Sequence, residues 1–592
     1  MKIGLISHYL ILFFWASTLL AQKEGDTWVI GYYGKGDPDY SVMHLNFSED
    51  NININWHFDE TMYITESSST ISTQSGDALI WTNGMQIFGQ GGQYICDTIS
   101  YGGFRSSYWD WYTTETYGPN GFPLHSSTLI LPIPESQYQY LVLYHTAEIN
   151  DELYFQVSQF LQAKISVEID TSFTVHYKDS LLGPYYKWYD GDIIATRHAN
   201  GRDWWIILFE ANSTTYHSFL LAPDGASLKH TGEIESPIKF GLGQSVFSPL
   251  GNFIAKVNAI TLEEGQYITL LEFDRCEGIL TLNSTFHTEA GYFTGAAFSP
   301  SDQFLYADDN HHLWQWDLTA DDIAASQILI DTFDGFVQPG WFPMRFGPMM
   351  QTPDDRIYIV PPAGSSEFMH VIDRPDMPGK ECRFLQHHVN LTKPNGRSAP
   401  NIPNFRLGPL DGSVCDTLGI DNLPVARWRF EENYPGYWYD IFFTDMSFYD
   451  PRTWHWDFDD GTTSNEQHTL HTFSPGLYHV CLTVSNDFGS DSLCRWVNVI
   501  ATETSDPIAP SRDLSIDPNP FRDALVIHSK SGVIRPVHMQ LFDIYGRLVF
   551  DQPRAPVPVT IYLPDRIGPG IYYCRIREED GTLLEFNLVK TQ

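Results

Sequence analysis

Short apolar runs recur along most of the chain, and many follow a turn that contains proline with glycine or aspartate. The pattern is clearest in three segments, at 247–254, 298–305 and 351–358. A second apolar strand follows each segment and ends in aspartate, at these residues: Asp274, Asp317 and Asp373. Paired short strands joined by turns of this composition predict an all-β protein.

The spacing of these segments predicts a β-propeller. Ile254, Leu305 and Tyr358 mark the first strand of each pair and lie 51 and 53 residues apart. Earlier strands extend the series with steps of 49, 64 and 61 residues, through these markers: Trp205, Leu141 and Ile80. A period near 50 residues suits a four-stranded blade, because one small sheet cannot bury both faces alone and stacks against its neighbours.

We therefore expect six or seven blades over residues 22–415, with a strand at 28–33 helping the carboxyl end of this region to close the seventh. A pair of stacked β-sandwiches is the alternative. The arrangement resembles the propeller-like amino-terminal regions of large exported proteins from Bacteroidetes, through these stretches: 75–84, 273–278 and 404–413. The resemblance covers about two thirds of the chain. It implies little about activity, because most members of that group have none assigned.

Residues 424–500 carry a different, ordered series of motifs: 456–461, 471–473, 475–478 and 484–489. Alternating apolar and polar residues at 478–484 predict a half-buried strand, and the turn at 486–489 leads into a partner strand at 492–499. The series resembles the PKD (polycystic kidney disease) domain, an immunoglobulin-like β-sandwich that serves as a spacer or binding module. The resemblance implies such a sandwich directly after the propeller.

The chain has seven cysteines and no Cys-x-x-Cys pair, which excludes zinc-knuckle and redox-motif arrangements. Cys481 and Cys494 lie on either side of the turn at 486–489, with their midpoint inside it. We therefore predict a cross-strand disulfide between them. Because seven is odd, at least one thiol is free or pairs with another chain.

One position departs from the PKD pattern Trp-x-Phe-Gly-Asp-Gly, since Asp459 stands where glycine is expected. Together with Asp457 and Asp460 it forms a cluster of carboxylates of the type that binds calcium. The alternative is a β-turn in which the aspartate side chains accept hydrogen bonds from their own backbone. We favour the turn.

A polar, proline-bearing linker at 501–512 precedes a last segment, 513–592. Its motifs predict a second small sandwich of about seven strands, and they lie at 517–521, 541–549, 570–576 and 588–590. Their order and spacing resemble the type A carboxyl-terminal sorting domain of the type IX secretion system, through these residues: Pro518, Asn519, Pro520, Gly546, Arg547, Gly570 and Tyr572. The resemblance implies that the type IX machinery is a partner, with release or attachment to the cell surface. A plain immunoglobulin-like domain is the alternative.

The amino terminus has the layout of a secretory signal over residues 1–21. Lys2 precedes an apolar stretch at 10–20, and we place signal cleavage between Ala21 and Gln22. The stretch is short for a bilayer span, although a membrane anchor is the alternative. No other segment approaches 18 consecutive apolar residues, so we expect no transmembrane span in the mature chain and a secreted or outer-membrane-surface location.

The charge of the chain excludes nucleic acid as a partner. Acidic residues number 73 against 35 Lys and Arg, for a net charge of −38. Nucleic-acid affinity rests largely on Lys and Arg, which release counterions from the phosphates, and anionic lipid would repel this surface too. The 15% of aromatic residues, with 44 Gly and 36 Pro, agrees with many short strands and tight turns.

No catalytic or cofactor motif accompanies this architecture, so we assign no catalytic, cofactor or metal residue. The pairs at 311–312 and 387–388 are adjacent histidines, which point to opposite faces of a strand and are expected in polar loops. Tryptophan is abundant, and packing between blades is favoured over carbohydrate stacking for these residues: Trp81, Trp109, Trp111, Trp204, Trp205, Trp314 and Trp316.

From these patterns we expect an exported, non-catalytic binding or adhesion protein. The propeller would recognise an extracellular glycan or protein, and the PKD-like domain would act as a spacer. Two alternatives are open at this point. One is a secreted glycan-active hydrolase or lyase with its active site in the propeller, since a pair of carboxylates is all that such chemistry requires. The other is a structural component of the surface or matrix.

Overall fold

The computed structural model describes residues 23–32, 42–47, 52–57, 62, 64, 66–96, 99, 121–122, 124–149, 155–168, 171–183, 192–238, 243–261, 265–288, 294–338, 343–432, 440–499, 514–517, 521–522, 524–529, 535–543, 548–563, 567, 570–578 and 583–590. They divide into two compact units, of which the first comprises residues up to Thr472 together with Tyr478–Val497. The fold is all-β, with three short 3-10 helices: η1 (Gln90–Gly92), η2 (Ala324–Ser326) and η3 (Gly379–Cys382). Within these ranges no helix is long and apolar enough to cross a membrane.

Seven antiparallel sheets form the first part of the described chain. Blade 1 comprises β4 (Ser69–Ser72), β5 (Ala78–Thr82), β6 (Ile87–Gly89) and β7 (Gln93–Cys96). Blade 2 comprises β8 (Thr128–Pro132), β9 (Gln139–Ile149), β10 (Phe155–Val167) and β11 (Phe173–Leu181). Blade 3 comprises β12 (Ile194–Arg197), β13 (Trp204–Phe209), β14 (Ser213–Ala222) and β15 (Gly225–Ile238).

The next three sheets repeat the plan. Blade 4 comprises β16 (Ser245–Phe247), β17 (Phe253–Thr261), β18 (Gly265–Asp274) and β19 (Ile279–Thr288). Blade 5 comprises β20 (Ala296–Phe298), β21 (Phe304–Asp308), β22 (His312–Asp317) and β23 (Ile328–Thr332). Blade 6 comprises β24 (Met349–Gln351), β25 (Ile357–Ile359), β26 (Ser366–Ile372) and β27 (Phe384–Asn395). The remaining sheet, blade 7, has three strands: β1 (Thr27–Gly31), β2 (Val42–Asn46) and β3 (Asn53–His57).

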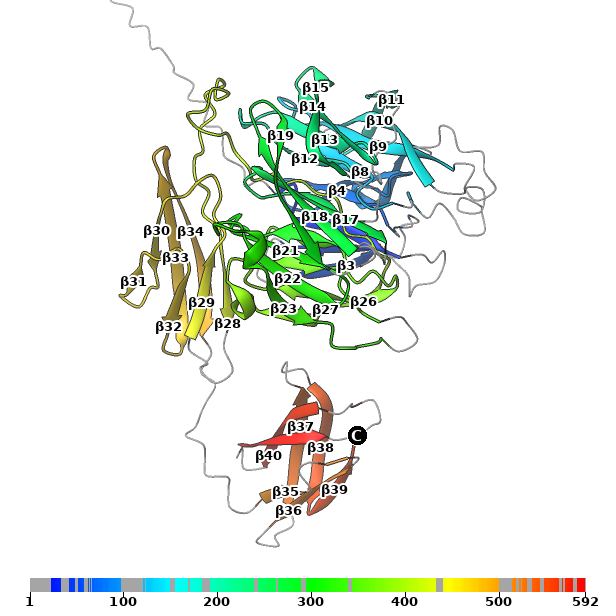
Figure 1. Ribbon diagram of the computed structural model, residues 1–592. Coiled ribbons are helices and arrows are strands. Elements are labelled where there is room, and N and C mark those ends of the chain that lie inside the picture. Colours follow the sequence, from blue (N-terminus) through cyan, green and yellow to red (C-terminus); the bar gives the residue numbers. More distant parts are fainter. Residues whose placement is uncertain are drawn as a thin grey trace, which may run out of the picture. The chain divides into compact units, whose positions relative to one another are not determined.

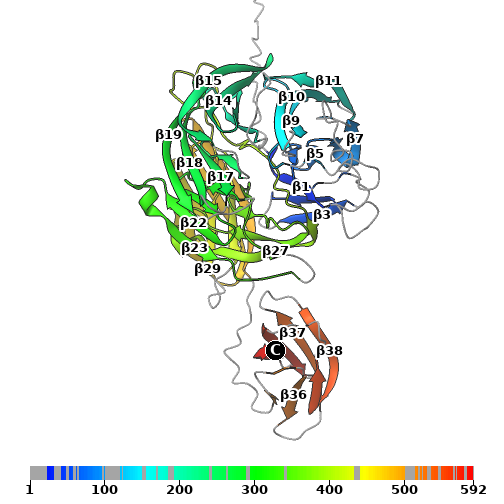
Figure 2. The same ribbon diagram turned by 45° about the vertical axis from the view of Figure 1, so that its right-hand side comes forward.

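These sheets follow one another around a common centre and form a β-propeller (Figure 2). The sequence markers all lie on the second strand of a blade: Ile80, Leu141, Trp205, Ile254, Leu305 and Tyr358. Second strands such as β5 and β13 are buried at every position, whereas the outermost strand β11 is largely exposed. Continuous apolar runs suit the second strands because neighbouring blades cover both of their faces. The predicted propeller is therefore confirmed, with seven blades in the described part of the chain.

Blade 7 closes the ring by joining the two ends of the propeller. β1 lies beside β4, where the Thr27 and Val29 amides donate hydrogen bonds to the hydroxyls of Ser72 (3.1 Å) and Thr70 (3.2 Å). Just after the last blade, the amide of Gly396 donates to the Gly31 carbonyl oxygen at 2.6 Å. Hydroxyl groups of blade 1 thus accept hydrogen bonds from the backbone amides of β1. Among the described residues, blade 7 has no fourth regular strand to accept them.

A smaller β-sandwich follows the propeller and is called the middle sandwich here. One of its sheets comprises β28 (Trp428–Glu432), β29 (Asp440–Asp445) and β32 (Thr469–Thr472). The other comprises β31 (Thr463–Ser464), β30 (Thr453–Asp457), β33 (Gly476–Asn486) and β34 (Gly489–Val499). Trp428 and Trp456 meet between the sheets in an edge-to-face contact, with ring centroids 5.7 Å apart.

The last described segment is a separate sandwich. Its sheets comprise β35 (Leu514–Asp517), β36 (Ala524–Ser529) and β39 (Val559–Tyr562), and β38 (Leu548–Val557), β37 (Arg535–Asp543), β40 (Gly570–Glu578) and β41 (Leu583–Lys590). Leu525, Leu541 and Ile576 are fully buried in its core. This agrees with the predicted small sandwich of about seven strands.

The middle sandwich is fixed to blade 6 by buried ion pairs, and it lies alongside the propeller in Figure 1. Arg429 of β28 is 1% exposed and donates to the carbonyl oxygen of Asp373, just after β26, at 2.7 Å. Glu431 of β28 accepts from Arg429 (2.5 Å) and from two propeller residues, Arg374 (2.7 Å) and Arg383 (3.1 Å).

Asp373 is the propeller residue that supplies a negative charge to this network. Its carboxylate pairs with Arg356 (2.7 Å) and Arg383 (3.0 Å), and Arg429 lies 3.7 Å away. Burial alone would raise the pKa of Asp373, but the guanidinium groups of Arg356 and Arg429 hold it below its ordinary value. The carboxylate therefore stays charged, and its partners extend from the propeller into the middle sandwich.

We predict that Asp373→Asn destabilises the first unit by about 3 to 5 kcal/mol, because it leaves several buried guanidinium groups without their counter-charge. Denaturant unfolding of the full chain measures this loss. Asp450→Asn is the matched control, since Asp450 is about half exposed and pairs with the exposed Arg452; it should leave stability unchanged. Equal effects of the two substitutions would contradict the role given to Asp373.

Candidate functional site

The repeated turns seen in the sequence join the first and second strands of blades 4, 5 and 6. Gly251, Asp302 and Asp355 occupy the same position in the three turns, and all are left-handed, with φ of 73°, 61° and 57°. Glycine adopts this conformation without strain, and aspartate is among the few other residues that tolerate it. The backbone therefore explains why the sequence repeat has either glycine or aspartate at this position.

The repeated turn of blade 5 is hydrogen-bonded to both neighbouring blades. Asp302 accepts a hydrogen bond from the Leu250 amide of blade 4 at 3.2 Å. Ser301 donates to Asp376 of blade 6 from its amide (3.0 Å) and its hydroxyl (2.5 Å). Hydrogen bonds thus join the repeated turns of blades 4 and 5, and connect the turn of blade 5 to the loop between β26 and β27 of blade 6.

Residues 396–411, the crossing segment, traverse the centre of the ring after the last blade. Asn401 donates from Nδ2 to the carbonyl oxygens of Thr128 (3.0 Å) and Ile193 (2.7 Å), next to blades 2 and 3. Asn404 donates to the Pro249 carbonyl of blade 4 at 2.8 Å, and Arg406 to the Pro353 carbonyl of blade 6 at 2.6 Å. One short stretch of chain therefore contacts blades on every side of the axis.

The last turn of blade 4 holds the end of the crossing segment. Arg275 is 5% exposed and donates to the backbone carbonyls of Gly408 (2.5 Å) and Arg197 (3.0 Å). Burial lowers the pKa of Arg275 to about 10, so the guanidinium remains charged at neutral pH. The next residue, Cys276, forms a disulfide with Cys415, across a sequence separation of 139. A cation and a covalent bond thus anchor the segment at one point.

A cavity of about 750 Å³ lies between these turns, the crossing segment and the middle sandwich. The propeller contributes the innermost strands β12, β16, β20 and β24 together with the repeated turns. The crossing segment contributes a continuous run at 399–411, and the middle sandwich contributes residues 445–452, 454, 467 and 468. We call this space the junction cavity. Its volume falls in the range of small-molecule binding sites.

The wall from the middle sandwich is an ordered polar and aromatic surface. Asp445 accepts hydrogen bonds from the Trp454 indole (2.7 Å) and from Gln467 (3.2 Å), and the His468 ring accepts from the Asp445 amide (3.1 Å). Burial raises the pKa of Asp445. The hydrogen bonds fix the orientation of the Trp454 ring at the cavity wall.

The junction cavity is acidic. Five aspartates and three arginines line it in the part of the chain that the structure describes. Burial raises the pKa of Asp355 to about 7, while the Arg406 guanidinium opposes the rise and the Asp376 carboxylate adds to it. The net charge of −38 on the whole chain repels an anionic ligand on its approach. Aromatic rings, amides and carboxylates together suit a polar, uncharged molecule with many hydroxyl groups.

The family comparison identifies one part of the chain. Residues 436–500 match the family model of the PKD domain. The middle sandwich is a PKD domain. The PKD1 domain from the Vibrio cholerae metalloprotease PrtV shares 28% identity with this chain, over 13% of this chain and 98% of that one, with a TM-score of 0.12. No curated protein sequence matches the chain.

Two solved structures are similar to the propeller region. A protein from Lactobacillus plantarum shares 13% identity over 63% of this chain and 98% of its own, with a TM-score of 0.36. A putative 6-phosphogluconolactonase from Bacteroides uniformis shares 11% identity over 62% of this chain and 98% of its own, with a TM-score of 0.37. Neither assigns an activity to this chain.

The structure joins Cys481 and Cys494 by a disulfide between β33 and β34 of the PKD domain. The cleavage residues Ala21 and Gln22 lie outside the described residues. So do five of the sorting-motif residues: Pro518, Asn519, Pro520, Gly546 and Arg547. Gly570 and Tyr572 lie on β40, where Tyr572 is buried. None of these residues lines the junction cavity, within the ranges described.

The aspartate cluster of the PKD domain forms the favoured turn. Asp459 has a left-handed φ of 61°, which explains glycine as the usual residue there. Asp457 accepts from the Asp459 amide (3.0 Å), Asp460 from the Thr462 amide (2.9 Å), and Asp459 from the His479 amide (3.0 Å). All three carboxylates are thus used by nearby backbone.

The expectation of polar loops for the adjacent histidines is wrong for one pair. His387 and His388 lie within β27, where His387 adopts a φ of 52° and pairs with Asp334 at 3.0 Å. His312 begins β22 and pairs with Asp309 at 3.1 Å, after a turn that includes His311. A local irregularity in β27 accommodates the histidines without ending the strand.

Most of the candidate tryptophans among the described residues pack between blades, as favoured. Trp81, Trp204, Trp205 and Trp316 are almost fully buried, and Trp316 stacks on Phe286 of the preceding blade with centroids 5.4 Å apart. Trp314 is half-buried, and Trp109 and Trp111 lie outside the described residues. Trp454, which lines the junction cavity, was not among the candidates.

Sequence reasoning also missed Arg275, Asp355 and the Cys276–Cys415 disulfide. The aligned turns contained a signal for Asp355, because its repeat position coincides with those of Gly251 and Asp302. No local pattern relates Cys276 to Cys415, since the crossing segment alone brings them together. The stretch 404–413 carried part of the resemblance, but its role in crossing the ring required the structure.

We predict that Asp302→Asn stabilises the protein above neutral pH. Burial raises the pKa of Asp302 to about 7, so the folded state holds a proton that the unfolded chain releases near its ordinary value, and stability falls as pH rises between the two. Thermal unfolding should give the variant a higher Tm than the wild type at pH 8, with the difference vanishing near pH ~4. Asparagine retains the acceptor for Leu250 and tolerates the left-handed backbone.

The exposed Asp321 of the same blade provides the control, and Asp321→Asn should leave the pH profile unchanged. A variant at position 302 that is less stable than the wild type at pH 8 would contradict the assignment of a buried, protonated carboxyl group.

Proposed function

We propose that the protein is an exported, non-catalytic binding protein of the cell surface or surroundings, which recognises an uncharged glycan in the junction cavity. The observation that carries this proposal is a cavity of about 750 Å³ walled by both the propeller and the PKD domain. A site of this size with aromatic and hydrogen-bonding walls suits one or a few sugar units. The PKD domain then forms part of the recognition site, in addition to any role as a spacer.

Charge supports an uncharged ligand. The chain carries a net charge of −38, and aspartates outnumber arginines in the cavity lining. Electrostatic repulsion would disfavour the approach of acidic glycans, whereas the hydroxyl groups of a neutral glycan can donate hydrogen bonds to the carboxylates. Trp454 offers an apolar ring face of the kind that stacks on sugar rings.

Export through the type IX machinery is supported by the amino-terminal signal layout and by the order of motifs in residues 513–592. Attachment to the surface or release into the medium would follow from that route. Either outcome places the junction cavity where extracellular polysaccharides are available.

A second candidate function is the cleavage of glycans by a hydrolase or lyase reaction, and one observation favours it. Asp355 has a pKa raised to about 7 and lines the same cavity as Asp376. Glycoside hydrolysis requires two carboxyl groups, one of which acts as the acid and has a raised pKa. In that case Asp355 would act as the acid.

A polysaccharide array probed with the mature full chain tests the first function, with product release monitored in the same wells. We expect saturable binding without products, and about tenfold weaker binding by Trp454→Phe, which reduces the stacking surface. Glu235→Gln on β15, exposed and outside the cavity lining, is the control and should bind as the wild type. Products that disappear in Asp355→Asn would establish the hydrolase instead, and no binding at all would favour a structural role.

Deletion of residues 513–592 tests the export route. We expect the truncated chain to accumulate inside the outer membrane, because the sorting signal is lost, while the full chain reaches the surface or the medium. Cell fractionation with immunodetection measures the distribution. Equal surface delivery of both chains would contradict the assignment of a sorting domain.

A further inference from the structure

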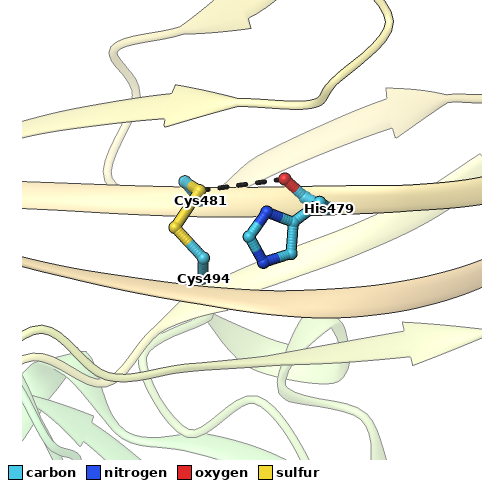
Figure 3. Close-up of side chains that lie close together, drawn as sticks. All are labelled: His479, Cys481 and Cys494. Carbon is cyan, nitrogen blue, oxygen red and sulfur yellow. Dashed lines mark hydrogen bonds between the residues drawn. A yellow bond between two sulfur atoms is a disulfide. The ribbon is translucent and has the colours of Figure 1, made fainter.

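Three side chains of metal-ligand type meet on the outer face of the PKD domain. His479 and Cys481 are two residues apart on β33, so they share one face of the strand, and Cys494 lies on the adjacent β34 (Figure 3). One ring nitrogen of His479 and the two sulfur atoms all lie within 4.8 Å of one another. None of these three residues lines the junction cavity.

The cluster is accessible. His479 and Cys494 are exposed, and Cys481 is half-buried. Trp496 of β34 is 61% exposed and packs against the His479 ring, with centroids 4.6 Å apart. A small reductant and a metal ion can therefore reach the sulfur atoms from solvent, and exposed disulfides are more readily reduced than buried ones.

The neighbouring strand keeps the cluster in place and makes it acidic. Asp457 of β30 is the register partner of Cys481 on β33. Asp459 accepts a hydrogen bond from the His479 amide at 3.0 Å, which holds the backbone of β33 at this point. Two carboxylates thus lie beside the cluster and favour the approach of a divalent cation.

In the oxidised protein the two sulfur atoms bond to each other, so neither is the thiolate that metal binding requires. We propose that reduction of the Cys481–Cys494 disulfide by a small dithiol turns this cluster into a site for a zinc-class divalent ion. The dithiol is oxidised to its own disulfide and Cys481 and Cys494 become thiols. Binding then forms two metal–sulfur bonds and one metal–nitrogen bond, with release of the two thiol protons.

Two thiolates and one imidazole are a ligand set that zinc prefers, and the open side of the cluster leaves a fourth position for water. The disulfide and the metal exclude each other, because both use the same sulfur atoms. By linkage, the metal stabilises the reduced form and makes the disulfide easier to reduce.

Cobalt(II) titration of the mature full chain tests this proposal, because thiolate ligation of cobalt produces a charge-transfer absorption in the near ultraviolet. The chain carries Cys96→Ser, Cys276→Ser and Cys415→Ser, so that Cys382 and Cys574, both buried, are its other thiols. We expect one equivalent of cobalt after reduction and none before it, with zinc displacing the cobalt signal.

His479→Ala should weaken cobalt binding by at least about tenfold, because it removes one of three protein ligands. The matched control is His455→Ala, an exposed histidine on β30 of the same sheet, which should bind as the parent chain. Cys494→Ser should abolish the charge-transfer band of a two-thiolate site.

Three results would overturn the proposal. They are equal cobalt binding before and after reduction, unchanged binding by His479→Ala, and loss of the β-sheet circular dichroism of the chain on reduction. The last result counts against the site because the ligands converge only while β33 and β34 remain paired.

Discussion

The carboxylate of Asp373 holds the first unit together, because it joins guanidinium groups from both the propeller and the PKD domain. Arg356 and Arg383 approach it from blade 6, and Arg429 approaches it from β28. Buried charges of this kind contribute little when compared with apolar packing, yet removing one partner is costly. The main effect of the network is therefore to fix the position of the PKD domain against the propeller. Its contribution to the net stability is small.

That placement has a structural consequence at the end of the propeller. The repeated turns of blades 4, 5 and 6, with Gly251, Asp302 and Asp355 in the left-handed conformation, face the crossing segment and the PKD domain. A propeller alone would present these turns to solvent. With the PKD domain fixed against blade 6, they become one wall of a cavity whose other wall includes Trp454.

The sequence was sufficient to predict the features that depend on local spacing. The strands marked by Ile254, Leu305 and Tyr358 repeat because each blade is a local unit, and the turn between Cys481 and Cys494 brings those residues together. The step of 64 residues between Leu141 and Trp205 fits the long strands β9 and β10 of blade 2. Contacts between distant segments had no such signal: nothing near Asp373 in the sequence indicates Arg429, and nothing near Cys276 indicates Cys415.

Native-state hydrogen exchange of the full chain across a denaturant series tests most directly whether the network makes one unit of the two domains. The account predicts that amides of β25 and β26 in blade 6 lose protection at the same denaturant concentration as those of β28 and β33 in the PKD domain, because the two open together. Loss of protection in β28 and β33 well before blade 6 would show a PKD domain that opens by itself, and would contradict a cavity built jointly by the two.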